Sequence, residues 1–136
     1  FDALRHHAVC VALPLAHSLT VSQEVGLEQI LSERLIGFTL ADYPEHHAWI
    51  AAMFAEFPRP AMIVEEHDSV TSLIVAVEAG KGVALVAEGF EQLSGTRLTI
   101  RPIRPAPPLL AVGIAYKDER LTAATEGFIA AAKHVA

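Results

Sequence analysis

The sequence has 136 residues, of which 52% are hydrophobic and 19% charged, and it carries a formal net charge of −6. This length and apolar content suffice for one domain with a core, whereas the longest apolar stretches, such as residues 48–55, are far shorter than the roughly 18 residues of a membrane span. The basic residues are scattered, which argues against a nucleic-acid surface because phosphate binding needs a concentrated basic patch.

The start of the chain indicates its setting. It begins at Phe1 without an initiator methionine and enters a strand-like run almost at once, so we interpret it as a piece of a longer protein. It has one cysteine, Cys10, and its first residues do not resemble a signal peptide. We therefore expect a cytoplasmic protein with no internal disulfide and no membrane partner.

The predicted elements begin with a strand at residues 6–13, a short helix at 27–33 and a second strand at 34–39. A longer helix is predicted from Pro44 to about Phe57, since proline is tolerated at the first position of a helix. Its bulky residues recur at the helical period, and its small residues line a second face. The small residues are Ala48, Ala51, Ala52 and Ala55.

A third strand at 61–65 precedes a turn at Glu66, His67 and Asp68, and a helix follows that Asp68 or Ser69 caps and Gly80 closes. A fourth strand is predicted at 83–87. Alternation of strands and helices implies a mainly parallel sheet covered by helices. We therefore expect the strands near 34–39, 62–65 and 83–86 in one sheet.

The pattern changes after Gly89. Strands are predicted at 97–101 and 109–116, and a closing helix from about Leu121 with Thr122 as a possible cap. We expect residues 6–13 and 109–116 to lie together in a different sheet from the middle of the chain.

Four segments resemble the LysR-type transcriptional regulators. Residues 12–19 (ALPLAHSL) resemble that family's "LP…HPL" segment, and residues 38–44 resemble the strand and loop that follow it. Residues 69–87 (SVTSLIVAVEAGKGVALVA) match a hydroxyl-capped helix, "VaaG-GVALVP" and a strand, and residues 110–135 resemble the last strand and terminal helix. The segments occur in the right order over nearly the whole chain.

The resemblance implies an α/β fold similar to type 2 periplasmic binding proteins, with two subdomains and an effector in the cleft between them. On this mapping, residues 1–18 are the end of subdomain I and the outward crossover, 19–87 are subdomain II, and 88–136 are the return crossover and the C-terminal part of subdomain I. The chain would then hold a complete subdomain II, without the first half of subdomain I or the helix-turn-helix.

The implied function is that of an effector-binding domain that senses a small molecule and controls DNA binding through a domain absent from this chain. Two alternatives share the fold: a periplasmic solute-binding protein of a transporter, and a lyase or dehydratase. Against an enzyme stands the lack of a nucleophile–base pair or a metal set. Cys10 lies in an apolar strand, and adjacent histidines such as His46 and His47 point apart on a helix, so we expect no catalytic residue, metal or cofactor.

Ligands of open α/β sheets bind at the carboxyl ends of strands, and the sequence offers two such turns. The predicted ligand-binding residues are Thr39, Asp42, Tyr43, His67, Ser69 and Val70. The amides that open the helix after Ser69 carry partial positive charge, and Thr71 and Ser72 add hydroxyl donors. Whether Ser69 contacts a ligand or only caps the helix stays open.

Acidic residues crowd the same region, namely Asp42, Glu65, Glu66 and Asp68, and the sequence does not place Arg34, Arg59 or Lys81 to offset them. An anionic effector would then be repelled, and a neutral or zwitterionic one is equally open. The acids could also be solvated surface.

We further expect a homodimer or higher homo-oligomer. Effector domains of the resembling family pair helix against helix, and the alanine face of the 44–57 helix is either that interface or an intramolecular contact. The strand at 6–13 and the closing helix would also lack their usual cover, and an exposed apolar patch favours association.

Overall fold

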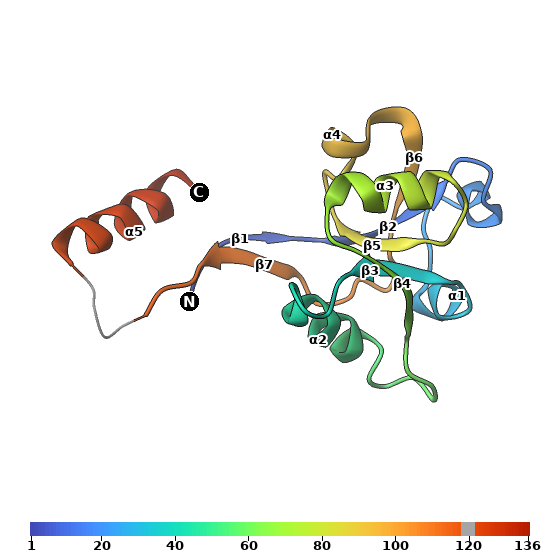
Figure 1. The fold of residues 1–136 in the computed structure, drawn as a ribbon, viewed down its shortest axis with the longest axis horizontal. Coiled ribbons are helices and arrows are strands. Elements are labelled where there is room, and N and C mark those ends of the chain that lie inside the picture. Colours follow the sequence, from blue (N-terminus) through green and yellow to red (C-terminus); the bar gives the residue numbers. More distant parts are fainter. Residues whose placement is uncertain (118–121) are drawn as a thin grey trace. The chain divides into compact units, whose positions relative to one another are not determined.

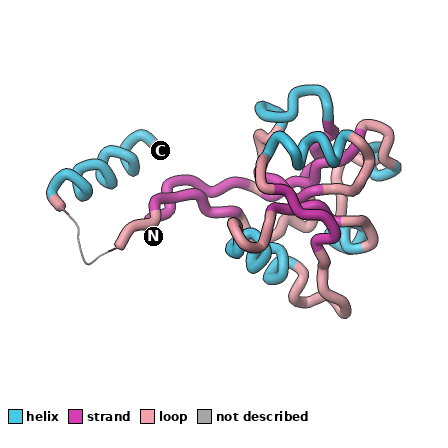
Figure 2. Tube along the Cα trace, in the orientation of Figure 1, coloured by secondary structure: helices cyan, strands magenta, loops and turns pink. Residues whose placement is uncertain are grey.

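The computed structural model describes residues 1–117 and 122–136, and its chain divides into two compact units (Figures 1 and 2). The larger unit is Ala8–Pro108, and the smaller unit joins Phe1–His7 to Leu109–Ala136. No helix among the described residues is long and apolar enough to cross a bilayer.

The larger unit contains a three-stranded sheet and a two-stranded sheet, which are joined by one β-bridge. Strand β2 (Val9–Pro14) lies between β5 (Ala84–Ala87) and β6 (Leu98–Pro102) and is antiparallel to both. Strand β3 (Leu35–Phe38) pairs in parallel with β4 (Ile63–His67). The predicted pairing of these two strands is therefore confirmed.

The third strand predicted for that sheet, β5, forms its hydrogen-bonded pairing with β2 and lies in the sheet of β2 and β6, so the prediction of one sheet is wrong for β5. It joins β3 only through a parallel bridge between Leu35 and Val83, where the Ile36 amide donates to the Val83 carbonyl at 2.8 Å and the Val83 amide to the Arg34 carbonyl at 2.9 Å. Gly82 permits this approach, because a Cβ there would lie 2.4 Å from the Arg34 carbonyl oxygen.

The single strand predicted at residues 6–13 is wrong, because the chain forms two strands there. Strand β1 (Asp2–His7) pairs antiparallel with β7 (Leu110–Ile114) in the smaller unit, whereas β2 pairs only within the larger unit. Their compositions explain the break at Ala8. All residues from Val9 to Leu13 are buried, as in a central strand, while the polar residues of β1 are exposed or half-buried.

Two helices of the larger unit differ in length from their predictions. Helix α1 (Leu27–Leu31) is short, and the Gly26 amide before it donates to Oε1 of Gln29 at 2.9 Å. Helix α2 (Pro44–Met53) begins at Pro44 as predicted but ends four residues early. Its buried side is narrow, with Ile50 and Phe54 the buried members of the predicted apolar stripe.

Helix α3 (Val70–Glu78) matches its prediction and holds the core together. Its buried residues, Leu73, Ile74, Ala76 and Val77, pack in a cluster with residues of β2, β3 and β5. Gly80 ends the helix at φ 79°, and the Lys81 amide returns to the Ala76 carbonyl at 3.1 Å, which closes the last turn. Figure 1 shows α3 on one face of the strands and α2 on the other.

The remaining elements of the larger unit are short: the 3-10 turns η1 (Ser18–Val21) and η2 (Gly95–Arg97), and helix α4 (Glu91–Ser94). In the smaller unit, helix α5 (Ala123–Val135) starts at Thr122, whose hydroxyl accepts a hydrogen bond from the Thr125 amide at 3.2 Å, as predicted. Leu121, the predicted helix start, lies outside the described residues. Asp2 accepts a hydrogen bond from the Tyr116 hydroxyl at 2.7 Å and lies 3.0 Å from Nζ of Lys133.

Candidate functional site

The two predicted turns meet at one edge of the β3–β4 pair. Phe38 ends β3 opposite His67, which ends β4, and the Thr39 amide donates to the His67 carbonyl at 3.0 Å. Because the strands are parallel, their carboxyl ends open in the same direction. The segments that follow, 39–43 and 68–70, therefore begin side by side, as the sequence predicted.

The first turn is closed by its own side chains. The Thr39 hydroxyl donates to Oδ2 of Asp42 at 2.9 Å, and the Tyr43 amide donates to the Thr39 carbonyl at 2.9 Å. The Tyr43 ring lies against Phe38, with 5.1 Å between the ring centroids. The Thr39 hydroxyl thus donates to Asp42, and it can donate to a ligand only when a ligand oxygen replaces the Asp42 carboxylate as its acceptor.

The second segment differs from its prediction at His67, which is the last residue of β4 and not part of a turn. Nε2 of His67 lies 3.0 Å from Oε1 of Glu65, and Nζ of Lys81 lies 3.5 Å from the same oxygen. Loss of solvation raises the pKa of Glu65, but the His67 hydrogen bond and the Lys81 charge outweigh it, so that the pKa falls below its ordinary value. Glu65 is therefore held ionised between two basic groups.

Ser69 caps α3. Its Oγ accepts a hydrogen bond from the Ser72 amide at 3.2 Å and lies 3.0 Å from Oγ of Ser72. Capping at this residue is confirmed, and Asp68 is not the cap. The amides of Val70 and Thr71, at the first two helical positions, have no partner inside the helix and remain available to an acceptor.

A cavity of about 400 Å³ runs along α3 from Ser69 to Lys81. His67 and Ser69 line it, whereas Thr39, Asp42, Tyr43 and Val70 do not. Thr71 and Ser72, predicted as additional hydroxyl donors, line it as well. The six predicted residues therefore share one edge of the strands but only two of them share this cavity.

Of the lining residues that the sequence did not indicate, Lys81 is charged and Val75, Ala76 and Ala79 are apolar. Lys81 follows the glycine that ends α3, and the reversal of the chain there brings its side chain to Glu65. Arg34 lies nearby, with Nε donating to the Lys81 carbonyl at 3.2 Å. The crowding of acids is therefore partly offset, contrary to what the sequence indicated, although Arg59 contributes nothing here because it contacts Leu31 and Ser32.

The paired histidines of α2 have unlike environments. Nε2 of His47 lies 2.7 Å from the Phe38 carbonyl and 3.4 Å from Oε1 of Glu66. Nε2 of His46 is buried without a hydrogen-bond partner, and burial, followed by the neighbouring His47, lowers the pKa of His46. Among the described residues, no three His, Cys, Asp or Glu side chains gather where they could hold a metal ion.

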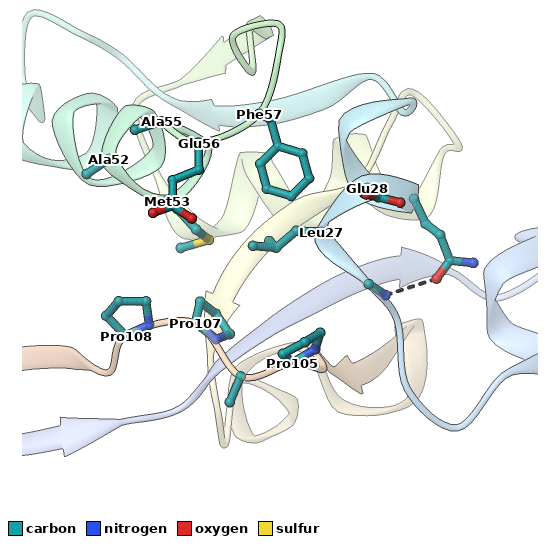
Figure 3. A pocket seen from close by; sticks show the side chains of 13 residues that line it. Leu27, Glu28, Ala52, Met53, Ala55, Glu56, Phe57, Pro105, Pro107 and Pro108 are labelled. Carbon is teal, nitrogen blue, oxygen red and sulfur yellow. Dashed lines mark hydrogen bonds between the residues drawn. The ribbon is translucent and has the colours of Figure 1, made fainter.

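A second cavity of about 860 Å³ lies elsewhere on the larger unit, between α1, the end of α2 and the segment Pro105–Pro108 (Figure 3). None of the six predicted residues lines it. Its larger volume alone does not make it the effector site, because its walls hold no strand end.

A mixed α/β unit whose parallel strands open at one edge is consistent with the fold of the type 2 periplasmic binding proteins. The family model of the LysR substrate binding domain matches residues 1–136, and the chain belongs to that family. No curated protein matches the sequence.

Solved structures of low sequence identity share the fold. The chain resembles the BenM effector binding domain with its effector benzoate at a TM-score of 0.72 and 17% identity, over 98% of this chain and 61% of that one. The effector binding domain of QuiR in complex with shikimate gives 0.72 and 17%, over 99% and 64%. The C-terminal domain of a probable LysR family transcriptional regulator from Rhodococcus sp. RHA1 gives 0.77 and 20%, over 96% and 65%. The chain thus spans less than two thirds of each.

Proposed function

We propose that this chain is the effector-binding part of a LysR-type transcriptional regulator and not an enzyme. A small molecule would bind at the carboxyl ends of β3 and β4 and control DNA binding by a separate helix-turn-helix domain. Such control requires that the effector bind two states of the regulator with different affinity. A transporter's solute-binding protein and a lyase or dehydratase are not favoured, because the family and the similar structures are those of regulators.

The observation that carries the proposal is the set of donors along the cavity beside α3. Thr71 brings a hydroxyl and Lys81 brings a cation to this cavity. The hydroxyls of Ser69 and Ser72 donate to Ser72 Oγ and to the Ser69 carbonyl, and they reach a ligand by exchanging those bonds. The first amides of α3 add partial positive charge beside them. Thr39, Asp42, Tyr43 and Val70 extend the site along the neighbouring turn.

The same groups favour an effector that accepts hydrogen bonds, and we propose a small organic carboxylate. The acids that would repel it are partly neutralised, because Glu65 is held between His67 and Lys81 and Glu66 lies 3.4 Å from His47. Benzoate and shikimate, the ligands of two similar domains, are both carboxylates and are suitable first probes.

The wider assignments belong to the same proposal. We propose that the Ala8–Pro108 unit contains subdomain II and that the Phe1–His7 and Leu109–Ala136 segments belong to subdomain I. The whole protein would act in the cytoplasm as a homodimer or higher homo-oligomer, and DNA would be bound only by the separate domain.

The test is a titration of the full-length protein with benzoate, shikimate and related carboxylates, together with Thr39→Val and Ser69→Ala. Losing one hydrogen bond costs about 0.5–1.5 kcal/mol, or up to roughly tenfold in affinity. Effector-dependent transcription should weaken in both variants while DNA binding without effector stays unchanged. Thr99→Val, which makes the same change in β6, is the matched control.

If both variants bind every carboxylate with wild-type affinity, the effector does not bind at this site. Unfolding must be measured beside binding, because Ser69→Ala also removes a helix cap. Ser69→Thr keeps the capping oxygen and should restore both stability and binding.

A further inference from the structure

The second cavity of the larger unit has a chemistry unlike that of the proposed effector site. Its walls are the first turn of α1, the end of α2 and the proline segment Pro105–Pro108, all within Ala8–Pro108. It shares no lining residue with the cavity beside α3. An inference about it therefore does not depend on the proposed function.

Its inner surface is apolar. Figure 3 shows the side chains of Leu27, Met53 and Phe57 pointing into the space above Pro107. Phe57 is held in place by the buried Phe54, with 5.8 Å between the ring centroids. Proline restricts its own backbone, so this wall is formed before any ligand arrives.

The groove continues along α2. A smaller cavity of about 100 Å³ is lined by Trp49 and shares Ala52, Met53 and Pro108 with the larger one. Tryptophan is the strongest aromatic partner of organic cations. The extension thus adds an aromatic surface to one end of the groove.

The ionisable residues that line the larger cavity are Glu28 and Glu56, and no basic residue lines it. Neither glutamate has an ion-pair partner within the described part of the chain. Arg59, two residues beyond the wall, instead bonds the Leu31 carbonyl, and Arg104 bonds the Ile103 carbonyl at 3.0 Å. The rim of the cavity therefore carries two carboxylates that no basic side chain pairs with among the described residues.

We propose that this groove binds a small organic cation with an apolar body. The body would lie against Leu27, Met53 and Phe57, and the cationic group would lie beside Glu28 and Glu56. A volume of about 860 Å³ suits a single small molecule, since such sites typically measure roughly 300–1,000 Å³. Two carboxylates without a base select a cation over an anion or a neutral molecule of the same shape.

The experiment is calorimetric titration of the full-length protein with benzyltrimethylammonium, whose charge does not depend on pH. Benzyl alcohol and phenylacetate are the neutral and anionic comparisons. We expect the cation to bind several-fold tighter than either, with an affinity that falls as salt is added. The double variant Glu28→Gln with Glu56→Gln should lose about 3- to 10-fold in affinity for the cation, the range for two exposed charges. Glu45→Gln, in α2 but outside the groove, should leave the affinity unchanged.

Ala52→Trp provides a second variant, because Ala52 is exposed and lines both parts of the groove. Its indole should fill the groove and abolish cation binding without changing the unfolding midpoint or the binding of a carboxylate effector. The proposal is overturned if benzyl alcohol binds as tightly as the cation, or if the double variant keeps wild-type affinity. It is equally overturned if Ala52→Trp dissociates an oligomer in light scattering yet leaves cation binding intact, since a second copy would then occupy the groove.

Discussion

The two cavities of the Ala8–Pro108 unit differ in the charged side chains that line them. The cavity beside α3 joins three hydroxyls, His67 and Lys81 to an apolar strip of Val75, Ala76 and Ala79, whereas the groove beside α2 is lined mainly by apolar side chains and bordered by Glu28 and Glu56. The first therefore suits an acceptor of hydrogen bonds, and the second suits a cation with an apolar body. If both proposals hold, the two sites take ligands of opposite charge.

The two surfaces also differ in support. Helix α3 has nine residues, four of them buried, and is closed by Ser69 at one end and Gly80 at the other. Helix α1 has five residues and one that is buried, Ile30. A wall anchored by several buried side chains keeps its shape, while a short helix opens more easily. We therefore expect the α3 cavity to be rigid and the α1 wall of the α2 groove to adapt.

The largest expected effect comes from making the same leucine-to-alanine substitution in α3 and in α1. Leu73→Ala deletes a fully buried side chain of α3 and should destabilise the protein by about 2–5 kcal/mol. Leu27→Ala, on the half-buried wall of the groove, should cost clearly less because part of that side chain already meets water. Chemical denaturation of both variants measures the difference, and equal losses would contradict the contrast in rigidity.

A smaller effect is expected at the cap of α3. Ser69→Ala removes the oxygen that accepts from the Ser72 amide and should cost about 1 kcal/mol of unfolding free energy. Ser22→Ala is the matched control, because Ser22 is exposed and its side chain makes no hydrogen bond within the described residues. A thermal melt in which both variants lose the same stability would show that the cap does not support this cavity.

The local parts of this architecture could be predicted from the sequence. Helix α3 was predicted because a hydroxyl cap, apolar residues at the helical period and a closing glycine all lie within twelve residues. The parallel pairing of β3 and β4 followed from the alternation of elements. The partners of β2 could not be predicted, because Cys10 pairs with Val86 and Pro102, and no local signal fixes such distant contacts.

The sites show the same division. His67 and Ser69 could be predicted because each closes or opens an element, whereas Lys81 reaches Glu65 only through the chain reversal after α3. Of the α2 groove, the sequence indicated only Ala52 and Ala55, as part of the alanine face of the 44–57 helix. Leu27, Phe57 and Pro107 are far apart in the chain, and each alone resembles an ordinary core or loop residue.

The smallest expected effect concerns acid and the Glu65 carboxylate beside the α3 cavity. The His67 hydrogen bond and the Lys81 charge lower the pKa of Glu65 in the folded protein below its ordinary value of 4.5, against the opposing effect of lost solvation. The unfolded chain therefore binds more protons than the folded chain between these two pKa values, and stability rises with pH across that window. The contribution to stability is present above the ordinary pKa and is lost as pH falls through the pKa of the folded protein.

Carbon-detected NMR titration of the Glu65 carboxyl should show the lowered pKa in the wild type. His67→Leu, which removes the hydrogen-bond donor, should raise it more than Lys81→Met, because the hydrogen bond from His67 precedes the charge of Lys81 among the causes that lower this pKa. If the Glu65 carboxyl titrates at its ordinary value in the wild type, His67 and Lys81 do not stabilise its charge. The partial neutralisation of the acidic residues proposed for this site would then not hold.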